Sequence, residues 1–325
     1  MKQNTSFDEI AQIIQASQKV AVLSHVNPDP DAFGSSGGLA LALRKLGKKV
    51  VLVNETGPLD GLAWIPLVRE VRTDFVPGDY DLLMCCDCGD AKRVGDSLLE
   101  KVRSHPNVIN LDHHASNDFF GTYNIVEPRA SSAAEVVLKV IEALRVPLDS
   151  EISTALYAGL SADTGSFRYS STETSSFAMA QKLVSAGANP FAIAQELYAR
   201  VSLAALKLQS EALGALKIVA DGRISLVAVT FKMLKSSGAN KQDADSLVDI
   251  VRDIDGVAVA VLLKEDAGFW RVSMRSRVPQ VDVAEVAGIF GGGGHKAAAG
   301  FRWKKERAEL ESLLLAELER RLPRV

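Results

Sequence analysis

A histidine and two aspartates, His25, Asp29 and Asp31, lie within seven residues near the start of the chain. They follow the apolar run 20–23, which predicts a short buried strand, and precede residues 37–46, which predict a helix. In open α/β sheets, ligands bind where strands lead into helices. Two carboxylates this close repel each other unless a cation joins them, and imidazole with carboxylate suits first-row divalent metals. The stretch therefore predicts part of a metal site.

Two more predicted strands end on residues of the same kinds. The predicted strand 81–86 is followed by Asp87, and the predicted strand 108–111 is followed by Asp112, His113 and His114. Because the carboxyl ends of parallel strands share one edge of a sheet, we expect these side chains to converge with the first group. Taken singly, each aspartate could be a helix cap and each histidine an ordinary loop residue.

One more candidate ligand, Asp163, directly follows an apolar helix predicted over residues 149–162, where a lone charge would be costly without a partner. Two divalent ions roughly 3.5–4 Å apart need about this many ligands, with one carboxylate shared between them. The donor set favours manganese, with magnesium, cobalt or iron as alternatives, and suits phosphate-ester hydrolysis. The proposed ligands are His25, Asp29, Asp31, Asp87, His113 and Asp163.

Short apolar strands alternate with helical patterns through the first part of the chain, which predicts an α/β fold with a parallel sheet and helices on both faces. After residue 216 the pattern changes, and an Asp-Gly turn at 221–222 predicts a β-hairpin. With 325 residues the chain is long enough for two domains. We expect a catalytic domain over residues 1–190, a helical connector over 191–215, with one helix spanning 190–213, and a smaller α/β domain over 216–325.

Four consecutive glycines, 291–294, precede His295 inside the second domain. Such a run can be a flexible linker, but bare backbone N–H groups can also hold an anion. Arg275 and Arg277 at the end of a nearby predicted strand favour the anion pocket.

Composition limits the kinds of substrate and partner that the chain can bind and the cellular compartment in which we expect it. The formal net charge of −3 offers little excess of cations for a long duplex, so a nucleic-acid substrate would be short. Cys85, Cys86 and Cys88 have no distant partner and are interpreted as buried small side chains rather than a disulfide framework or metal site. The chain lacks an apolar run long enough to span a membrane, and it begins on a polar stretch unlike a signal peptide, so we expect a cytoplasmic protein.

The four N-terminal motifs resemble those of the DHH phosphoesterase superfamily: the 25–35 stretch, Asp87, the Asp-His-His at 112–114 and the Asp-Thr-Gly at 163–165. The segments 273–276 and 291–300 resemble the family's associated C-terminal domain. The compact layout is most similar to the bacterial nanoRNase and pAp phosphatase branch, rather than to the longer RecJ exonucleases. The resemblance covers essentially the whole chain and implies two domains across a cleft.

The resemblance also implies roles for individual residues. His25, Asp29 and Asp87 would hold one metal ion, and Asp31, Asp87, His113 and Asp163 the second, with Asp87 bridging. His114 would contact the scissile phosphate, and Asp112 would hold His113. The residues implied to bind substrate are Ser273, Arg275, Gly292, Gly293, Gly294, His295 and Arg168. One departure from the family pattern is Pro30, where glycine is usual between the two aspartates.

Together these features predict a manganese-dependent enzyme that hydrolyses very short oligoribonucleotides to 5′-mononucleotides and dephosphorylates pAp to AMP. Alternatives are a phosphodiesterase for cyclic or linear dinucleotides, a RecJ-like single-strand exonuclease and, less favoured, a pyrophosphatase. A binding module without turnover would lack metal ligands, and none is missing here. We expect no membrane partner, and a homodimer is compatible with the sequence.

Overall fold

The computed structural model describes residues 4–199 and 201–323, and the chain divides into two compact units, residues 1–200 and 201–325. The division falls between helices α7 (Pro190–Tyr198) and α8 (Leu203–Gly214). The prediction of one helix over 190–213 is therefore wrong. Ser202 caps α8 by accepting a hydrogen bond from the Ala205 N–H, so a new helix begins there.

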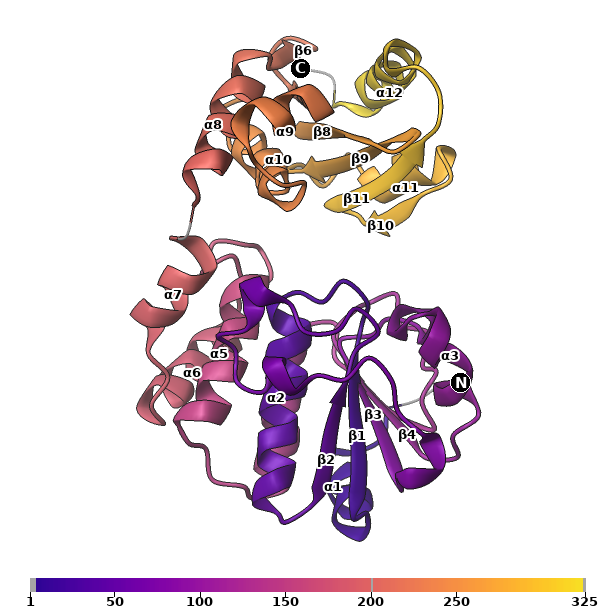
Figure 1. Cartoon of the computed structure of the whole chain (residues 1–325), viewed down its shortest axis with the longest axis vertical. Helices are drawn as coiled ribbons and strands as arrows, with labels where there is room; N and C mark the ends of the chain where they lie inside the picture. Colours follow the sequence, from indigo (N-terminus) through magenta and orange to yellow (C-terminus); the bar gives the residue numbers. More distant parts are fainter. Residues whose placement is uncertain (1–3, 200, 324–325) are drawn as a thin grey trace. The chain divides into compact units, whose positions relative to one another are not determined.

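The first unit is built on five parallel strands in the order β2-β1-β3-β4-β5, which confirms the predicted parallel sheet (Figure 1). Ser24 pairs with Cys86, and Cys86 with Leu111, so three strands end at the same edge. The short strand β5 was not predicted, because its Tyr-Asn start breaks the apolar pattern. The strands are β1 (Lys19–Ser24), β2 (Lys49–Val53), β3 (Leu82–Cys86), β4 (Val108–Asp112) and β5 (Tyr123–Val126).

Helices cover both faces of this sheet, as the sequence predicts. One face shares its core with α1 (Phe7–Ala16), α2 (Pro30–Lys45), α4 (Ala133–Ala143) and α5 (Ser150–Asp163). The other face packs against α3 (Asp96–Arg103) through Leu98 and Val102. The cysteines at 85, 86 and 88 are buried in these cores, which confirms that they are small buried side chains. The first unit is completed by α6 (Thr174–Ser185) and α7.

Helix α2 begins at Pro30, seven residues before the predicted start at Gly37. Asp29 caps it: one carboxylate oxygen accepts hydrogen bonds from the N–H groups of Asp31 and Ala32, at 3.0 and 2.9 Å. Proline suits the first helical position, since its missing N–H would have no partner inside the helix. Pro30 therefore fits where the family commonly has glycine.

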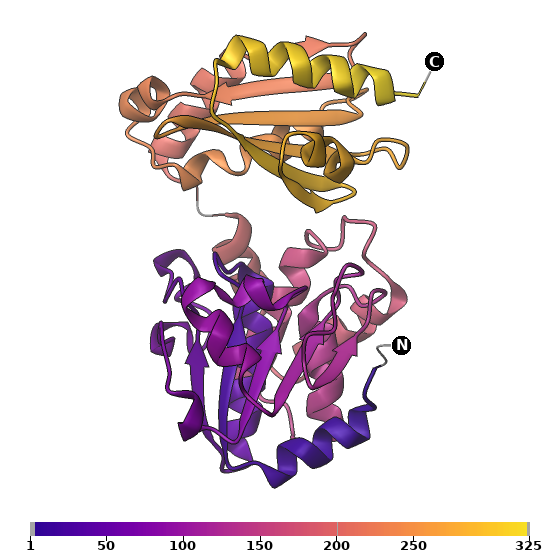
Figure 2. The same cartoon turned by 90° about the vertical axis from the view of Figure 1, so that its right-hand side faces the viewer.

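The second unit contains a six-stranded mixed sheet in the order β10-β11-β9-β8-β7-β6, with only β7 and β8 parallel. Helices lie on both of its faces, and Figure 2 shows α12 running across one of them. This confirms a second, smaller α/β unit. Its strands are β6 (Lys217–Val219), β7 (Ile224–Val229), β8 (Val259–Asp266), β9 (Phe269–Ser276), β10 (Gly293–His295) and β11 (Ala298–Trp303), and its helices after α8 are α9 (Phe231–Ser237), α10 (Leu247–Arg252), α11 (Val283–Ile289) and α12 (Arg307–Arg321).

In the part of the chain that the structure describes, no helix combines the length and apolar character needed to cross a membrane.

Candidate metal centre and substrate strip

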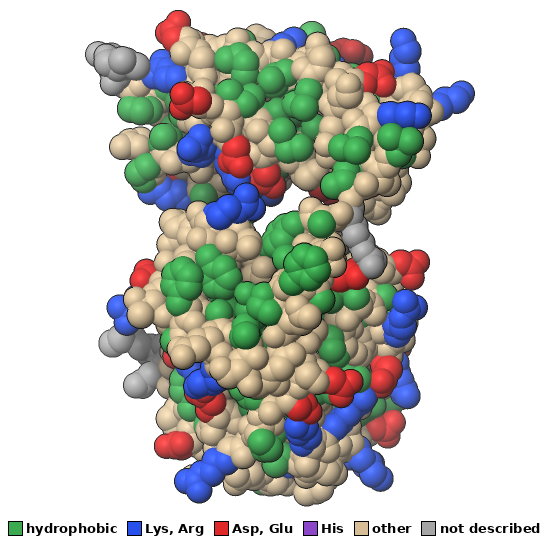
Figure 3. All heavy atoms as spheres, turned by 90° about the vertical axis from the view of Figure 1, so that its left-hand side faces the viewer, with side chains coloured by type: hydrophobic (Ala, Val, Ile, Leu, Met, Phe, Trp, Pro, Cys, Tyr) green, Lys and Arg blue, Asp and Glu red, His purple; other side chains and the backbone are tan. Residues whose placement is uncertain are grey.

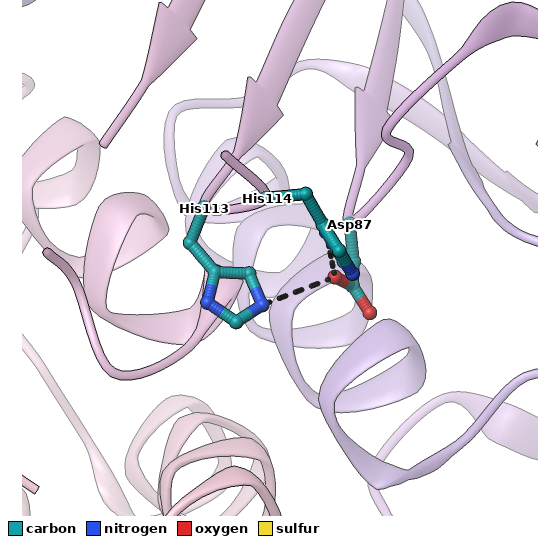
Figure 4. A group of neighbouring side chains, drawn as sticks. All are labelled: Asp87, His113 and His114. Atoms are coloured by element: carbon teal, nitrogen blue, oxygen red, sulfur yellow. Dashed lines mark ion pairs between the residues drawn. The ribbon is translucent and has the colours of Figure 1, made fainter. Parts of the chain in front are cut away.

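Asp87 lies at the centre of the candidate metal site. It follows β3 and faces histidines that follow β1 and β4; Figure 4 shows His113 and His114 beside it. Its Oδ1 lies 3.6 Å from His113 Nε2 and 3.5 Å from His114 Nδ1, whereas its Oδ2 lies 3.3 Å from His25 Nε2. The two carboxylate oxygens thus face different partners, as a carboxylate shared between two cations would.

One group of candidate ligands comprises His25, Asp29 and Asp87. His25 Nε2 lies 3.8 Å from Asp29 Oδ2, while its Nδ1 lies 2.9 Å from the Val26 carbonyl oxygen. A backbone carbonyl at Nδ1 orients the ring and leaves Nε2 as the nitrogen that faces the carboxylates, which is the usual arrangement for a metal-binding histidine.

The second group comprises Asp31, His113 and Asp163. His113 Nε2 lies 3.3 Å from Asp163 Oδ2, and its Nδ1 faces the Ala130 carbonyl at 3.3 Å. These two groups match the two ligand sets that the resemblance implies, apart from the shared Asp87.

The start of helix α4 holds Asp31 in place. The fully buried carboxylate of Asp31 accepts hydrogen bonds from the N–H groups of Ala133, at 2.6 Å, and Ala134, at 3.0 Å. The partial positive charge of a helix N-terminus stabilises a carboxylate there. Gly159 on α5 makes room, because a Cβ at this position would lie 2.3 Å from Asp31 Oδ1. Neither Gly159 nor α4 was predicted as part of the site, since their proximity to Asp31 arises only in the fold.

The electrostatics of the cluster are those of a site suited to a cation. Asp87 Oδ1 is buried and accepts no hydrogen bond from the described residues. Asp87 also has a left-handed backbone, with φ of 59°, a strained conformation that concentrates at functional sites. Burial would raise the pKa of Asp87, but His113 and His25 outweigh this and hold that pKa below its usual range.

Four members of the cluster favour bound protons: His25, His113, Asp31 and Asp163. Burial lowers the pKa of His25 and His113, but the neighbouring aspartates outweigh it and raise each pKa to about 10. Burial and the charge of Asp87 raise the pKa of Asp31 to about 7, and burial with the charge of Asp31 raises that of Asp163. A divalent cation would take the place of these protons, so the donor set fits a metal centre.

Asp112 contacts a different histidine from the one expected. Its Oδ1 lies 2.7 Å from His114 Nδ1, whereas His113 Nδ1 faces the Ala130 carbonyl. The implied contact between Asp112 and His113 is therefore wrong. Adjacent histidines after a strand point in different directions, so only one of them can face the last side chain of β4.

In the second unit, cross-strand pairing places four of the predicted substrate residues in two neighbouring rows. Arg275 pairs with Ala298, which pairs with His295; Ser273 pairs with Gly300, which pairs with Gly293. Directly opposite residues point to the same face of a sheet. Between the two rims the rows carry only glycine or alanine. We call these six residues the substrate strip.

The second half of the glycine run, Gly293 and Gly294, lies in strand β10, and the run is not a linker. A Cβ at Gly292 would lie 2.2 Å from the Gly300 carbonyl oxygen, and one at Gly294 would lie 2.6 Å from that of Ala298. These two glycines are required by the close approach of β10 to β11. Gly293 has open space around its Cβ position, so it is the one whose lack of a side chain leaves the strip bare.

The two arginines among the predicted substrate residues contact different kinds of partner. Arg275 Nε lies 3.5 Å from Asp249 Oδ1 on α10. Arg168, in the first unit, donates from Nε to the Gly165 carbonyl at 2.7 Å. It follows three residues with left-handed backbone, 165–167, which come directly after the metal-site segment ending at Thr164.

An Asp/His cluster at the carboxyl edge of a parallel sheet can hold divalent ions, and the family match identifies the chain as a metal-dependent hydrolase. Residues 19–160 match the DHH family N-terminal domain, and residues 224–322 match the DHHA1 domain. The chain belongs to the DHH phosphoesterase family.

Several relatives align over most of the chain. The bifunctional oligoribonuclease and PAP phosphatase NrnA of Thermus thermophilus is 31% identical over 90% of this chain and 86% of that protein. The protein of the same name from Bacillus subtilis is 26% identical over 94% of this chain and 97% of its own.

Solved structures agree on the fold. An exopolyphosphatase-related protein from Bacteroides fragilis superposes with a TM-score of 0.91 at 27% identity, covering 97% of this chain and 95% of that one. The exonuclease RecJ from Thermus thermophilus, solved with Mn²⁺, has a TM-score of 0.59 at 16% identity, covering 98% of this chain and 55% of RecJ. The RecJ likeness supports the fold alone.

Proposed function

We propose that this enzyme hydrolyses very short oligoribonucleotides to 5′-mononucleotides and dephosphorylates pAp to AMP, using two divalent ions. The names of the NrnA relatives support the substrates. The observation that carries the two-ion proposal is the position of Asp87, whose two oxygens face separate groups of ligands.

His25, Asp29 and Asp87 would hold one ion, and Asp31, Asp87, His113 and Asp163 the other. Manganese suits this donor set, with magnesium or cobalt as alternatives. When bound, the ions supply hydroxide near neutral pH and neutralise charge on the phosphoryl group.

The residues around the ions would orient the substrate and move a proton. His114, with Nδ1 held by Asp112, would contact the scissile phosphate and help to orient it or, once Nε2 has taken up a proton from water, protonate the leaving oxygen. Arg275, Ser273 and His295 would bind a distal phosphate or base on the substrate strip, with Gly292, Gly293 and Gly294 admitting it closely. Arg168 would add a positive charge near the metal centre. In this scheme residues 1–190 are the catalytic domain, 191–215 the connector and 216–325 the substrate domain.

A substrate panel tests the proposal. Purified protein with Mn²⁺ would be given pAp, linear RNA of two to five nucleotides, cyclic dinucleotides and a longer single strand, with Asp87→Asn as the matched inactive control. We expect turnover of pAp and the shortest RNAs by the unsubstituted protein only. Turnover of cyclic dinucleotides or the long strand, with pAp and short RNA intact, would replace this proposal with one of the alternatives.

A homodimer stays a prediction. Apolar side chains are exposed on α6 and α7, where Phe177 is 57% and Phe191 is 70% exposed, and Figure 3 shows hydrophobic side chains gathered on this face of the first unit. Exposed apolar patches of this kind often mark interaction surfaces.

A further inference from the structure

Behind His114, a buried side chain takes the second oxygen of Asp112. Asn117 Nδ2 donates to Asp112 Oδ2 at 2.6 Å and to the Cys88 carbonyl at 3.1 Å. Asn117 lies in the turn after β4 and is buried. Nothing in the residue types or spacing singled it out, since its partners come from two separate strand ends.

The orientation of the Asn117 amide is determined by the backbone around it. Its Oδ1 accepts from the Phe119 N–H at 2.7 Å and from Asn110 Nδ2 at 3.1 Å. A backbone N–H can only donate and the Cys88 carbonyl can only accept, so exchanging the amide oxygen and nitrogen would break both contacts. The amide must therefore present an N–H to Asp112.

This contact determines what Asp112 can do. Asp112 is fully buried, and a buried carboxylate is costly unless hydrogen bonds satisfy its oxygens. With Oδ2 accepting from Asn117, Oδ1 is directed at His114 Nδ1 at 2.7 Å. An oxygen that accepts requires the proton of His114 to reside on Nδ1, which makes Nε2 the nitrogen that exchanges a proton.

We propose that Asn117 is a positioning residue that holds Asp112 as an acceptor and so fixes the tautomer of His114. Asn117 acts through Asp112 and does not touch substrate. Its effect on turnover rests on the proposed phosphoesterase function, whereas its effect on the tautomer does not.

Metal binding can be measured separately from this role. Among the described residues, Asp112 belongs to no group of His, Cys, Asp and Glu side chains placed to hold a metal ion, whereas His114 lies in one such group with Asp87 and His113. The test therefore reads Mn²⁺ affinity beside the tautomer of His114, and we expect replacement of Asn117 to change the tautomer and leave the ion in place.

The test is Asn117→Asp, which preserves size but replaces the N–H donor with an acceptor facing Asp112. The histidine tautomers would be read by long-range ¹H–¹⁵N NMR on the Mg²⁺-loaded full chain, which has five histidines, with His114 assigned from a His114→Gln variant. We expect His114 to carry its proton on Nδ1 in the unsubstituted protein and to show a mixture of tautomers in the variant.

Kinetics and metal binding complete the test. We expect kcat to fall by about 10–100-fold, as for other residues that orient a catalytic or ligating histidine, with KM and Mn²⁺ affinity unchanged. Asn107→Asp, the same substitution at an exposed position of the first unit, should match the unsubstituted protein in all readouts.

A folded Asn117→Asp protein with an unchanged His114 tautomer would overturn the proposal, and so would a loss of Mn²⁺ affinity that accounts for the lower rate. Should this variant fail to fold, Asn117→Ser is read in the same way, since its shorter side chain cannot span to Asp112. If the unsubstituted protein hydrolyses none of the substrates, the proposed function fails while the NMR result still decides the role of Asn117.

Discussion

The metal centre and the substrate strip are built in opposite ways. In the metal centre, three histidines from two separate segments lie within 4 Å of Asp87: His25 after β1, and His113 and His114 after β4. In the strip, three rim side chains stand on one sheet face around positions that carry no side chain larger than a methyl group. The metal centre depends on the side chains that converge in it, whereas the strip depends on positions whose side chains are small or lacking.

This difference determines how each site should respond to substitution. The cluster depends on its central member, because His25, His113 and His114 all face Asp87, whereas the strip would lose one contact at a time. Substitutions in the metal centre should therefore abolish turnover, and substitutions in the strip should weaken binding.

The largest effect is expected for Asp87→Asn. Removing one negative charge from the shared position should lower kcat on the order of 10³-fold, because the ions contribute several kcal/mol of transition-state stabilisation. Mn²⁺ affinity, measured by calorimetry, should fall with it. Activity near that of the unsubstituted protein would contradict the shared position of Asp87.

Gly159→Ala should come next. The added methyl group would lie 2.3 Å from Asp31 Oδ1, so the carboxylate must move, and misplacing a reacting group by about 1 Å can cost about 10²-fold in rate. Gly61→Ala is the matched control, since its Cβ position is open. Equal rates for the two variants would show that Asp31 tolerates displacement.

Arg275→Ala tests the strip. We expect KM for pAp to rise about tenfold or more while kcat changes little, because a hydrogen bond to a charged group contributes about 1.5–3 kcal/mol. Arg271→Ala on the same strand is the control and should leave KM unchanged. A fall in kcat at constant KM would move Arg275 from binding into the chemical step.

The protons of the metal centre predict a pH effect on stability. His25 and His113 have pKa values of about 10 against 6.5 for the free side chain, so the stability they confer without metal is complete below pH 6.5 and is lost as pH rises towards 10. Asp87, with its lowered pKa, acts in the opposite sense, but only in acid. A divalent ion replaces the protons, so the rise in melting temperature on adding Mg²⁺ should grow from pH 6.5 to pH 9. A constant or shrinking rise would contradict the cluster's charge balance.

The smallest effect is expected for Pro30→Ala. Proline at the first position of α2 restricts the unfolded chain, so its loss should lower the free energy of unfolding by about 0.4–1 kcal/mol. The hydrogen bonds that hold the carboxylates of Asp29 and Asp31 do not involve the Pro30 side chain, so kcat should be unchanged. A drop in kcat in a stably folded variant would mean that proline shapes the ligand loop itself.

The sequence predicted what residue types alone reveal. Residue types alone indicate a set of metal ligands in His25, Asp29 and Asp31 and in the histidines after β4. The structure brings these side chains together. Hydrogen-bond partners that meet only in the folded chain could not be predicted. Whether Asp112 faces His113 or His114, for example, depends on side-chain direction at the end of β4.

The predicted helix boundaries were wrong where a capping residue, rather than the hydrophobic pattern, determines where the helix begins. Asp29 starts α2 at Pro30, and Ser202 starts α8, although the apolar spacing suggested a later start and one continuous helix. The strip was predicted from its glycines and arginine, but its rows depend on the register between β9, β11 and β10, which the sequence does not reveal.

Anomalous diffraction at the manganese edge, from crystals of the Mn²⁺-loaded protein, tests the central claim most directly. We predict two peaks about 3.5–4 Å apart, one beside His25 and Asp29, the other beside Asp31, His113 and Asp163, with Asp87 touching both. A single peak, or two peaks that Asp87 does not bridge, would contradict the two-metal centre.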